Sequence, residues 1–280
     1  MNHSVRELGS VQDQSGDSSS KRSETIMLAF LDILGFSNRV QRLGPDAVYA
    51  EYIDLLNAIE QSVQIRSSIV PIPVGGDRLG LVGCGGFKLH HAIFSDSILL
   101  WTNYGLPNVE PFLDRVTELF CEALLRNIPL RGCVTFGEAV MDNERDIYLG
   151  NPIIEAAQGE ASQSWLGVSF GPSVSAGFEW LGSLRHVIPY KIPSKSTSPA
   201  DAPSVALDWP RRWRERYSSA TGTDAVAKLT QLNTDLRFSR YYDSGTEFAR
   251  YSEQNSNWWD TVDWQSVAFV GHDASEPYAR

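Results

Sequence analysis

Two aspartates in strongly apolar surroundings constrain this chain more than any other feature. Asp32 lies in A-F-L-D-I-L-G-F-S, and Asp96 lies in H-A-I-F-S-D-S-I-L-L-W. A buried carboxylate is costly unless it is paired with a cation or bound to a metal. Two carboxylates brought together repel each other unless a cation lies between them. The pair predicts a divalent-metal site. The alternative is that Asp32 caps the following turn and that Asp96 only occupies a hairpin turn.

The composition is that of an ordinary globular protein with a sizeable core: 280 residues, 42% hydrophobic and 21% charged. A net charge of −10 argues against nonspecific nucleic-acid binding. No apolar run approaches about 18 residues, and the N-terminus lacks an apolar signal core. We therefore expect a cytoplasmic protein with no membrane span. The scattered cysteines predict small buried side chains rather than disulfides or zinc ligands: Cys84, Cys121 and Cys133.

Four segments are expected along the chain. Residues 1–24 are polar and predicted to be a disordered tail. Residues 25–192 alternate strand, helix, hairpin, helix, strand, helix and strand, which predicts an α+β domain with one central sheet. Residues 193–204 are a Pro/Ser-rich linker. Residues 205–280 form a C-terminal extension, expected to pack back on the domain or on a partner because it is rich in tryptophan: Trp209, Trp213, Trp258, Trp259 and Trp264.

The expected elements place both aspartates at strand ends. A strand runs through the apolar residues 26–34, and strands at 87–94 and 98–102 bracket S-D-S as a hairpin with Asp96 at its tip. Helices are expected from Pro45, over about 109–126, from Asn151, and over about 223–242. Residues 70–86 are expected to be a loop. Their glycines do not predict a phosphate loop, because no G-K-S/T follows.

The residues after Asp32 suit a polyphosphate. Gly35 lets the backbone turn tightly, so the amides of Leu34, Gly35 and Phe36 could point at phosphate oxygens. The carbonyl of Ile33 would be a third oxygen donor beside the metal. Magnesium and manganese suit such an all-oxygen site.

Four motifs together resemble one family. F-L-D-I-L-G-F-S resembles the F-x-D-I-x-G-F-S/T motif that opens the class III nucleotide cyclase domain, and F-S-D-S-I-L-L-W resembles its second metal-aspartate hairpin. L-R-G-C-V-T-F-G-E at 130–138 resembles the strand R-I/V-G-x-x-x-G-E. Y-L-G-N-P-I-I-E-A-A at 148–157 resembles W-G-x-x-V-N-x-A-A/S-R. The motifs occur in the family's order and cover about 26–192.

The resemblance implies a fold and a reaction. The fold would be a ferredoxin-like α+β domain whose central, mostly antiparallel sheet is flanked by helices. It would act as a head-to-tail homodimer with active sites at the interface. The ribose 3′-oxygen would attack the α-phosphate and expel pyrophosphate. Asp32 and Asp96 would be the catalytic residues that hold two Mn²⁺ or Mg²⁺ ions, one activating the hydroxyl and one neutralising the leaving phosphates.

The departures from the family bear on the base. Positions that read a purine in the family fall here on Ala92 and Ile147, and those that steady the transition state fall on Ile154 and Gln158. A purine edge would then lack hydrogen-bond partners. The pattern resembles the pyrimidine cyclases of bacterial anti-phage Pycsar systems, which implies a uridylate cyclase that makes cyclic UMP from UTP. The alternatives are a cytidylate cyclase and a catalytically silent, nucleotide-sensing domain.

The remaining contacts to the nucleotide are expected from two regions. Tyr49, Tyr52 and Arg39 are candidates to meet the smaller base, although Tyr52 also fits the apolar face of its helix. Lys191 and Arg131 are candidates to bind the triphosphate. The alternative for Lys191 is a solvated strand end, and for Arg131 it is an ion pair with a nearby carboxylate.

Overall fold

The computed structural model describes residues 22–63, 69–73, 79–83, 87–175, 185–195 and 205–256. Nearly all of the expected N-terminal tail, most of the expected linker and the last part of the expected extension lie outside these residues. So do several residues named above: Cys84, Trp258, Trp259 and Trp264. None of the helices in the described ranges is both long and apolar enough to cross a membrane.

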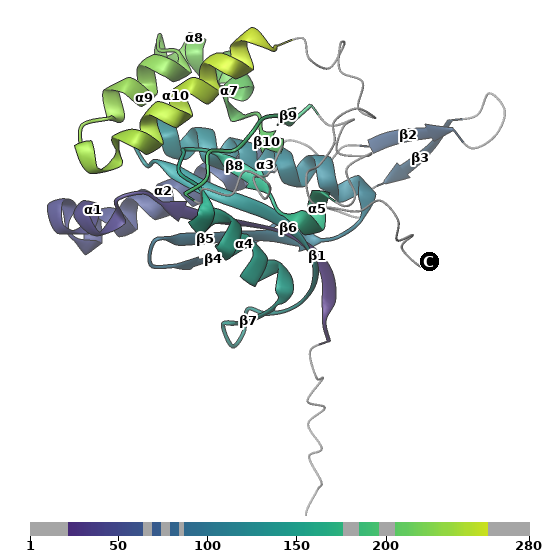
Figure 1. The fold of residues 1–280 in the computed structure, drawn as a ribbon. Helices are drawn as coiled ribbons and strands as arrows, with labels where there is room; N and C mark the ends of the chain where they lie inside the picture. The colour runs from purple at the N-terminus through teal and green to yellow at the C-terminus, as the bar shows by residue number, and fades with distance from the viewer. Residues whose placement is uncertain are drawn as a thin grey trace, which may run out of the picture.

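An eight-stranded sheet organises the molecule (Figure 1). The strands follow the order β4-β5-β1-β6-β8-β10-β9, and β7 pairs with β6 beside this path. Every pairing is antiparallel except the parallel pair of β6 with β8. The predicted α+β class and mostly antiparallel sheet are therefore confirmed. The strands are β1 Glu24–Ile33, β4 His90–Phe94, β5 Ser97–Asn103, β6 Leu130–Asp142, β7 Ile147–Gly150, β8 Val168–Phe170, β9 Val187–Pro189 and β10 Val205–Leu207.

The two faces of the sheet bury different cores. Because side chains alternate along a strand, Met27, Ala29, Leu31 and Ile33 of β1 enter the larger core, which includes α3 and the C-terminal helices. The intervening residues of β1 enter a smaller core beneath α4. Figure 1 shows α4 on the opposite side of the sheet from α3, α9 and α10. The helices before the C-terminal segment are α1 Phe36–Leu43, α2 Pro45–Val63, α3 Leu106–Leu125, α4 Asn151–Ser162 and α5 Pro172–Ser175.

The C-terminal segment belongs to the same fold. Its first strand, β10, lies in the central sheet between β8 and β9, so the segment begins inside the sheet. Trp209 and Trp213 are fully buried in the larger core, which confirms the expected packing for these two tryptophans. The later elements are α7 Trp209–Arg212, the π-helix η2 Trp213–Tyr217, α8 Ser218–Thr221, α9 Ala225–Leu232, the 3-10 helix η3 Leu236–Phe238 and α10 Ser239–Gln254.

Two sequence expectations about elements were wrong. The helix expected over about 223–242 is broken between α9 and η3, where Asp235 accepts a hydrogen bond of 3.0 Å from the Arg237 amide and starts a new turn. The region expected to be a loop holds a separate two-stranded sheet, β2 Ile69–Pro73 with β3 Leu79–Gly83. Its valines and isoleucines favour strands, and the glycines masked this signal.

Candidate metal and nucleotide site

The structure brings Asp32 and Asp96 together. Ser95 and Asp96 form the two-residue turn between β4 and β5, and Ser95 adopts a positive φ of 55° there. Asp32 pairs in register with Ser97, the residue after Asp96. The Ile33 amide donates a 2.9 Å hydrogen bond to the Asp96 carbonyl. The hairpin tip is thereby tied to the end of β1. Asp96 lies at this tip and Asp32 at this strand end, as expected from the sequence.

The charges around Asp32 suit a cation. Burial raises the pKa of Asp32, and the charge of Asp96 raises it further, whereas Arg131 lowers it. The described residues contain no group of three or more His, Cys, Asp and Glu side chains that could hold a metal. Magnesium, however, is usually bound by one or two carboxylates together with water and substrate phosphates. The two aspartates therefore fit a magnesium or manganese ion that shares its ligands with a nucleotide.

Arg131 lies between two carboxylates. It faces Asp32 across the β1–β6 pair, and its Nε and Nη2 donate to one Asp32 carboxylate oxygen at 3.2 and 3.1 Å. Its Nε also lies 2.6 Å from a carboxylate oxygen of Glu160 on α4. The structure therefore contains the ion pair with a nearby carboxylate that was the alternative expectation for Arg131.

Glu160 is a member of the site that sequence reasoning missed. Its side chain is buried, and burial together with the nearby charge of Asp32 raises its pKa to about 7 despite the opposing effect of Arg131. Gly159 makes this placement possible, because a Cβ there would lie 2.6 Å from the Cys133 sulfur of β6. The glycine lets α4 approach the sheet closely enough for Glu160 to reach Arg131.

The turn after β1 has the expected glycine but not all the expected free amides. Gly35 adopts φ 78° and immediately precedes α1. The amide of Leu34 already donates a 3.0 Å hydrogen bond to the Pro129 carbonyl, so it is not available to a phosphate, and the expectation for Leu34 was wrong. Phe238 of η3 covers the turn, with its ring 3.2 Å from the position of a Cβ on Gly35. Gly35 and Phe36 remain the candidates for main-chain contact.

Of the two tyrosines expected to meet the base, one is exposed and the other already makes contacts within the protein. Tyr49 is 67% exposed on α2. Tyr52 donates a 2.8 Å hydrogen bond to the Ser95 carbonyl and stacks on Phe36, with ring centroids 6.3 Å apart. Burial and the charge of Asp96 raise the pKa of Tyr52. Tyr52 therefore supports the hairpin turn that carries Asp96.

The guanidinium of Arg39 is already hydrogen-bonded to neighbouring residues. It makes two hydrogen bonds of 2.7 Å to Glu51 and one of 2.9 Å to the Asn127 carbonyl. These contacts fix α1 against α2 and the end of α3. A role in contacting the base would require them to be broken.

Besides Arg131, Lys195 is a cation whose charge reaches Asp32 and Glu160. Lys191 is exposed after β9. The charge of Lys195 lowers the pKa of both Asp32 and Glu160. Its ammonium donates a 2.6 Å hydrogen bond to the Ala161 carbonyl and lies 5.9 Å from the Tyr241 ring centroid. Sequence reasoning had assigned Lys195 to the linker and had no motif that reached the C-terminal segment.

Tyr241 brings the C-terminal segment into the site. The Arg131 guanidinium lies 5.4 Å from its ring centroid, on the ring that also meets Lys195. Cation–π contacts at such distances are attractive. Phe238 and Tyr241 thus form an aromatic wall beside Gly35 and Arg131.

The positions expected to read a purine, Ala92 and Ile147, are apolar, and those expected to steady the transition state, Ile154 and Gln158, are both exposed. Ala92 of β4 packs against the smaller core. Ile147 of β7 and Ile154 of α4 are 42% and 57% exposed, close in sequence to the 61% exposed Leu149. Gln158 is also exposed on α4. The side chains of Ala92 and Ile147 carry no hydrogen-bonding group with which to read a purine.

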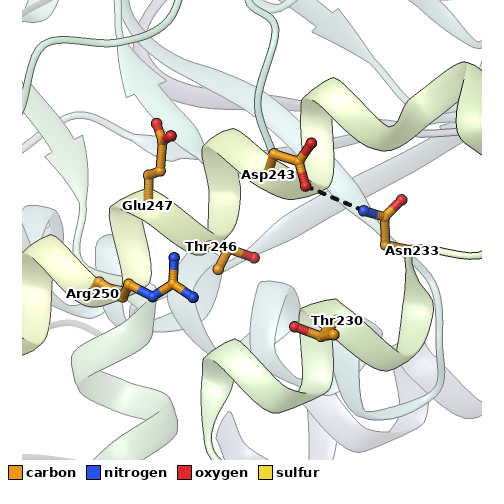
Figure 2. Close-up of a pocket in the computed structure, with 6 residues that line it drawn as sticks. All are labelled: Thr230, Asn233, Asp243, Thr246, Glu247 and Arg250. Atoms are coloured by element: carbon orange, nitrogen blue, oxygen red, sulfur yellow. Dashed lines mark hydrogen bonds between the residues drawn. The ribbon is translucent and has the colours of Figure 1, made fainter.

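A hollow of about 410 Å³ lies elsewhere, between α9 and α10 (Figure 2). Its lining is polar and includes the 3.3 Å hydrogen bond from Asn233 to Asp243. Neither Asp32 nor Asp96 lines it. The arrangement of charges, rather than this hollow, therefore marks the candidate site.

Comparison with known proteins leaves the sequence motifs and the geometry as the basis for a function. A scan against protein-family models and a search of curated proteins both found no match. The resemblance to class III cyclases therefore rests on the four sequence motifs.

Proposed function

We propose that the protein is a pyrimidine nucleotide cyclase that converts UTP to 3′,5′-cyclic UMP and pyrophosphate. The observation that carries the proposal is the contact between two motifs: Asp32 at the end of β1 and Asp96 at the β4–β5 turn, joined by the Ile33–Asp96 hydrogen bond. The motif strand that starts at Leu130 is the other neighbour of β1. Motifs on three adjacent strands are consistent with a ferredoxin-like cyclase sheet.

The proposed chemistry divides among a few groups. Two divalent metal ions held by Asp32 and Asp96 would supply Lewis acidity and charge neutralisation. Lys195 and Arg131 would bind phosphate oxygens. The Arg131 Nη1 is buried and lacks a hydrogen-bond partner, so a phosphate would provide the missing acceptor. The 3′-oxygen would then attack the α-phosphate in line with the departing pyrophosphate.

The preference for a pyrimidine follows from groups that are absent at two positions. Ala92 and Ile147 offer no donor or acceptor to a purine edge. A site that selects a base by hydrogen bonds rejects one whose polar groups it leaves unpaired. CTP is the alternative substrate, because these two positions do not separate the pyrimidines.

The active form is proposed to be a head-to-tail homodimer. Exposed apolar side chains on β4, β7 and α4 support it, since such surface is a common mark of an interface: Phe94, Ile147, Leu149 and Ile154. A partner on α4 and at Phe94, which is in register with Asp32 through Ser97, would face the sheet side that carries Asp32. As in the Pycsar systems it resembles, the product would be a cytoplasmic second messenger of anti-phage defence.

A silent nucleotide sensor is the second candidate. The observation in its favour is the Asp32–Arg131 ion pair, which gives the carboxylate a partner without any metal. The two functions differ in turnover, so one assay separates them.

The test is incubation of the protein with each of the four ribonucleoside triphosphates and Mn²⁺, with product identified by mass spectrometry. Cyclic product from UTP or CTP alone supports the proposal, and no product from any of them favours the sensor. Asp32→Ala and Asp96→Ala should abolish turnover and change the free energy of unfolding by less than about 2 kcal/mol. Asp54→Ala, at an exposed carboxylate of α2, is the matched control. Full activity in either site variant would refute the metal assignment.

A further inference from the structure

The Nε–H group of Arg131 lies beside two carboxylates, Asp32 and Glu160, but is directed at only one of them. Its Nε carries one hydrogen, which points at Asp32 and makes the 3.2 Å hydrogen bond. The same Nε lies 2.6 Å from Glu160 Oε1, but that oxygen is buried and receives no hydrogen bond. This oxygen therefore meets only the charge of the guanidinium, at a distance where a small rotation of the guanidinium would give it a hydrogen bond.

A buried carboxylate in this situation is unusual. Glu160 is 6% exposed, and buried acceptors nearly always have a donor. Its pKa is raised to about 7, mainly by burial. The arrangement suits a state in which Arg131 releases Asp32 and turns toward α4.

We propose that Glu160 is a positioning residue of the cyclase reaction: it takes over the Arg131 guanidinium when Asp32 binds a divalent metal ion, and so keeps Arg131 beside the triphosphate. The inference rests on the proposed function. In the arrangement seen here, Asp32 and Glu160 share the guanidinium. With Asp32 bound to a metal ion, Glu160 holds Arg131 alone, and the N–H groups released from Asp32 face the phosphates.

The surroundings limit where Arg131 can go. Glu160 lies on α4 and Asp32 on β1, and the Tyr241 ring lies 5.4 Å from the guanidinium. Without the Glu160 carboxylate, Asp32 is the one acidic partner that the described residues give Arg131. The guanidinium would then compete with the metal for that carboxylate.

The first experiment measures Mn²⁺ binding to the full-length protein by titration calorimetry, without substrate. Glu160→Gln and Glu160→Asp should both weaken Mn²⁺ binding by about tenfold, the loss expected from one charge-assisted hydrogen bond. Glu160→Asp keeps the negative charge, but its shorter side chain moves the carboxylate away from Arg131. It therefore distinguishes the positioning of Arg131 from the effect of the charge itself. Glu155→Gln removes a charge from the same helix, where Glu155 accepts from the Ser173 amide at 2.9 Å, and should match the wild type.

The second experiment measures kinetics at saturating Mn²⁺. Glu160→Asp should raise KM for the nucleotide with a smaller change in kcat, as Arg131→Ala should, and the double variant should be no worse than Arg131→Ala alone. Wild-type Mn²⁺ affinity and KM in Glu160→Asp would overturn the inference while leaving the proposed function intact. A wild-type protein that neither binds Mn²⁺ nor makes product would overturn both. If Glu160→Gln does not fold, the Glu160→Asp variant still decides.

Discussion

Gly35 has a left-handed backbone conformation directly beside the candidate site. Its φ of 78° is strained for any side chain, and a Cβ would also lie 3.2 Å from the Phe238 ring. We expect Gly35→Ala to lower the free energy of unfolding by about 1–2 kcal/mol, because both effects oppose it. Urea denaturation measures the change, and nucleotide turnover should fall because the start of α1 moves.

A matched control separates the two causes. Gly222 also has a positive φ, of 67°, but a Cβ there would meet nothing within 4 Å. Gly222→Ala therefore reports the backbone strain alone and should be the milder change. If the two alanine variants were equally destabilised, contact with Phe238 would have no part in the effect.

The sequence was informative about single residues where local context decides their role. Asp32 and Asp96 could be placed at strand ends because each interrupts an apolar run, and the structure has them there. Glu160 gave no such signal: it is one carboxylate within a helix, and it gains its neighbours only when Gly159 brings α4 onto β6. Lys195 gave no signal for the same reason, since no local pattern fixes which lysine the fold brings near the carboxylates.

At the scale of elements, the C-terminal helices are held to α3 by buried ion pairs. Arg212 of α7 pairs with Asp114 and, at 2.8 Å, with Glu118, and all three side chains are buried. Burial opposes ionisation of Asp114, but Arg212 outweighs it and holds the pKa of Asp114 low. Arg212→Met should lower the free energy of unfolding by about 3–5 kcal/mol, because it leaves two buried carboxylates without this partner.

The neighbouring arginine provides the control for this prediction. Arg211 pairs at 2.9 Å with Glu215, which is more than half exposed. Arg211→Met should change the free energy of unfolding by no more than about 1 kcal/mol, as is usual for surface pairs. Chemical denaturation of both variants would contradict the argument if their losses were similar.

Asp208, at the start of α7, should make stability depend on pH. It accepts hydrogen bonds from the Arg211 amide and the Ser252 hydroxyl, yet burial dominates and raises its pKa to about 6 from 3.8. A carboxyl whose pKa is raised by folding stabilises fully below its ordinary pKa, and this contribution is lost as the pH rises through 6. Asp208→Asn lacks the titration, so its stability relative to wild type should improve by about 2–3 kcal/mol from pH 4 to pH 7.

Urea denaturation at steps of one pH unit measures this trend. Asn keeps an oxygen that can accept from the Arg211 amide, so the cap is retained and the charge is removed. His186 titrates with the opposite sign, since burial lowers its pKa to about 4, but it is present in both proteins and cancels. A constant difference between Asp208→Asn and wild type across the range would show that the buried charge has no such effect.

Elements were predictable where one periodicity continued and unpredictable where small local groups intervened. The apolar runs at β1 and the hydrophobic spacing along α3 were found close to their observed bounds. The continuous helix expected near the end of the chain failed at Asp235, whose capping hydrogen bond competes with the helix. The placement of β10 between β8 and β9 depends on tertiary pairing over only three residues, which no local pattern reports.

At the scale of the whole molecule, the sheet has one heavily covered face and one sparsely covered face. The larger core packs against α3 and the C-terminal helices, whereas α4 lies over β6 and β1 on the other face (Figure 1). Asp32, Arg131 and Glu160 lie on the α4 side, as does the exposed Ile154 of α4, whereas Ile147 and Leu149 of β7 alternate with Tyr148 of the smaller core and point to the other face. The candidate site and the α4 part of the proposed dimer surface therefore belong to the same side of the sheet.

This arrangement predicts that self-association and activity are lost together. Leu149→Asp combined with Ile154→Asp places two charges on side chains that are 61% and 57% exposed, so the fold should tolerate them while a dimer should not. Sedimentation velocity should report a monomer, and turnover should fall about a hundredfold because the site would lose groups supplied by the partner. Ile53→Asp, at a 39% exposed residue of α2, should leave both properties unchanged. A fully active monomer would mean that one chain carries the complete site, and the nucleotide contacts would then have to come from Phe238, Tyr241 and the other residues that surround Asp32 here.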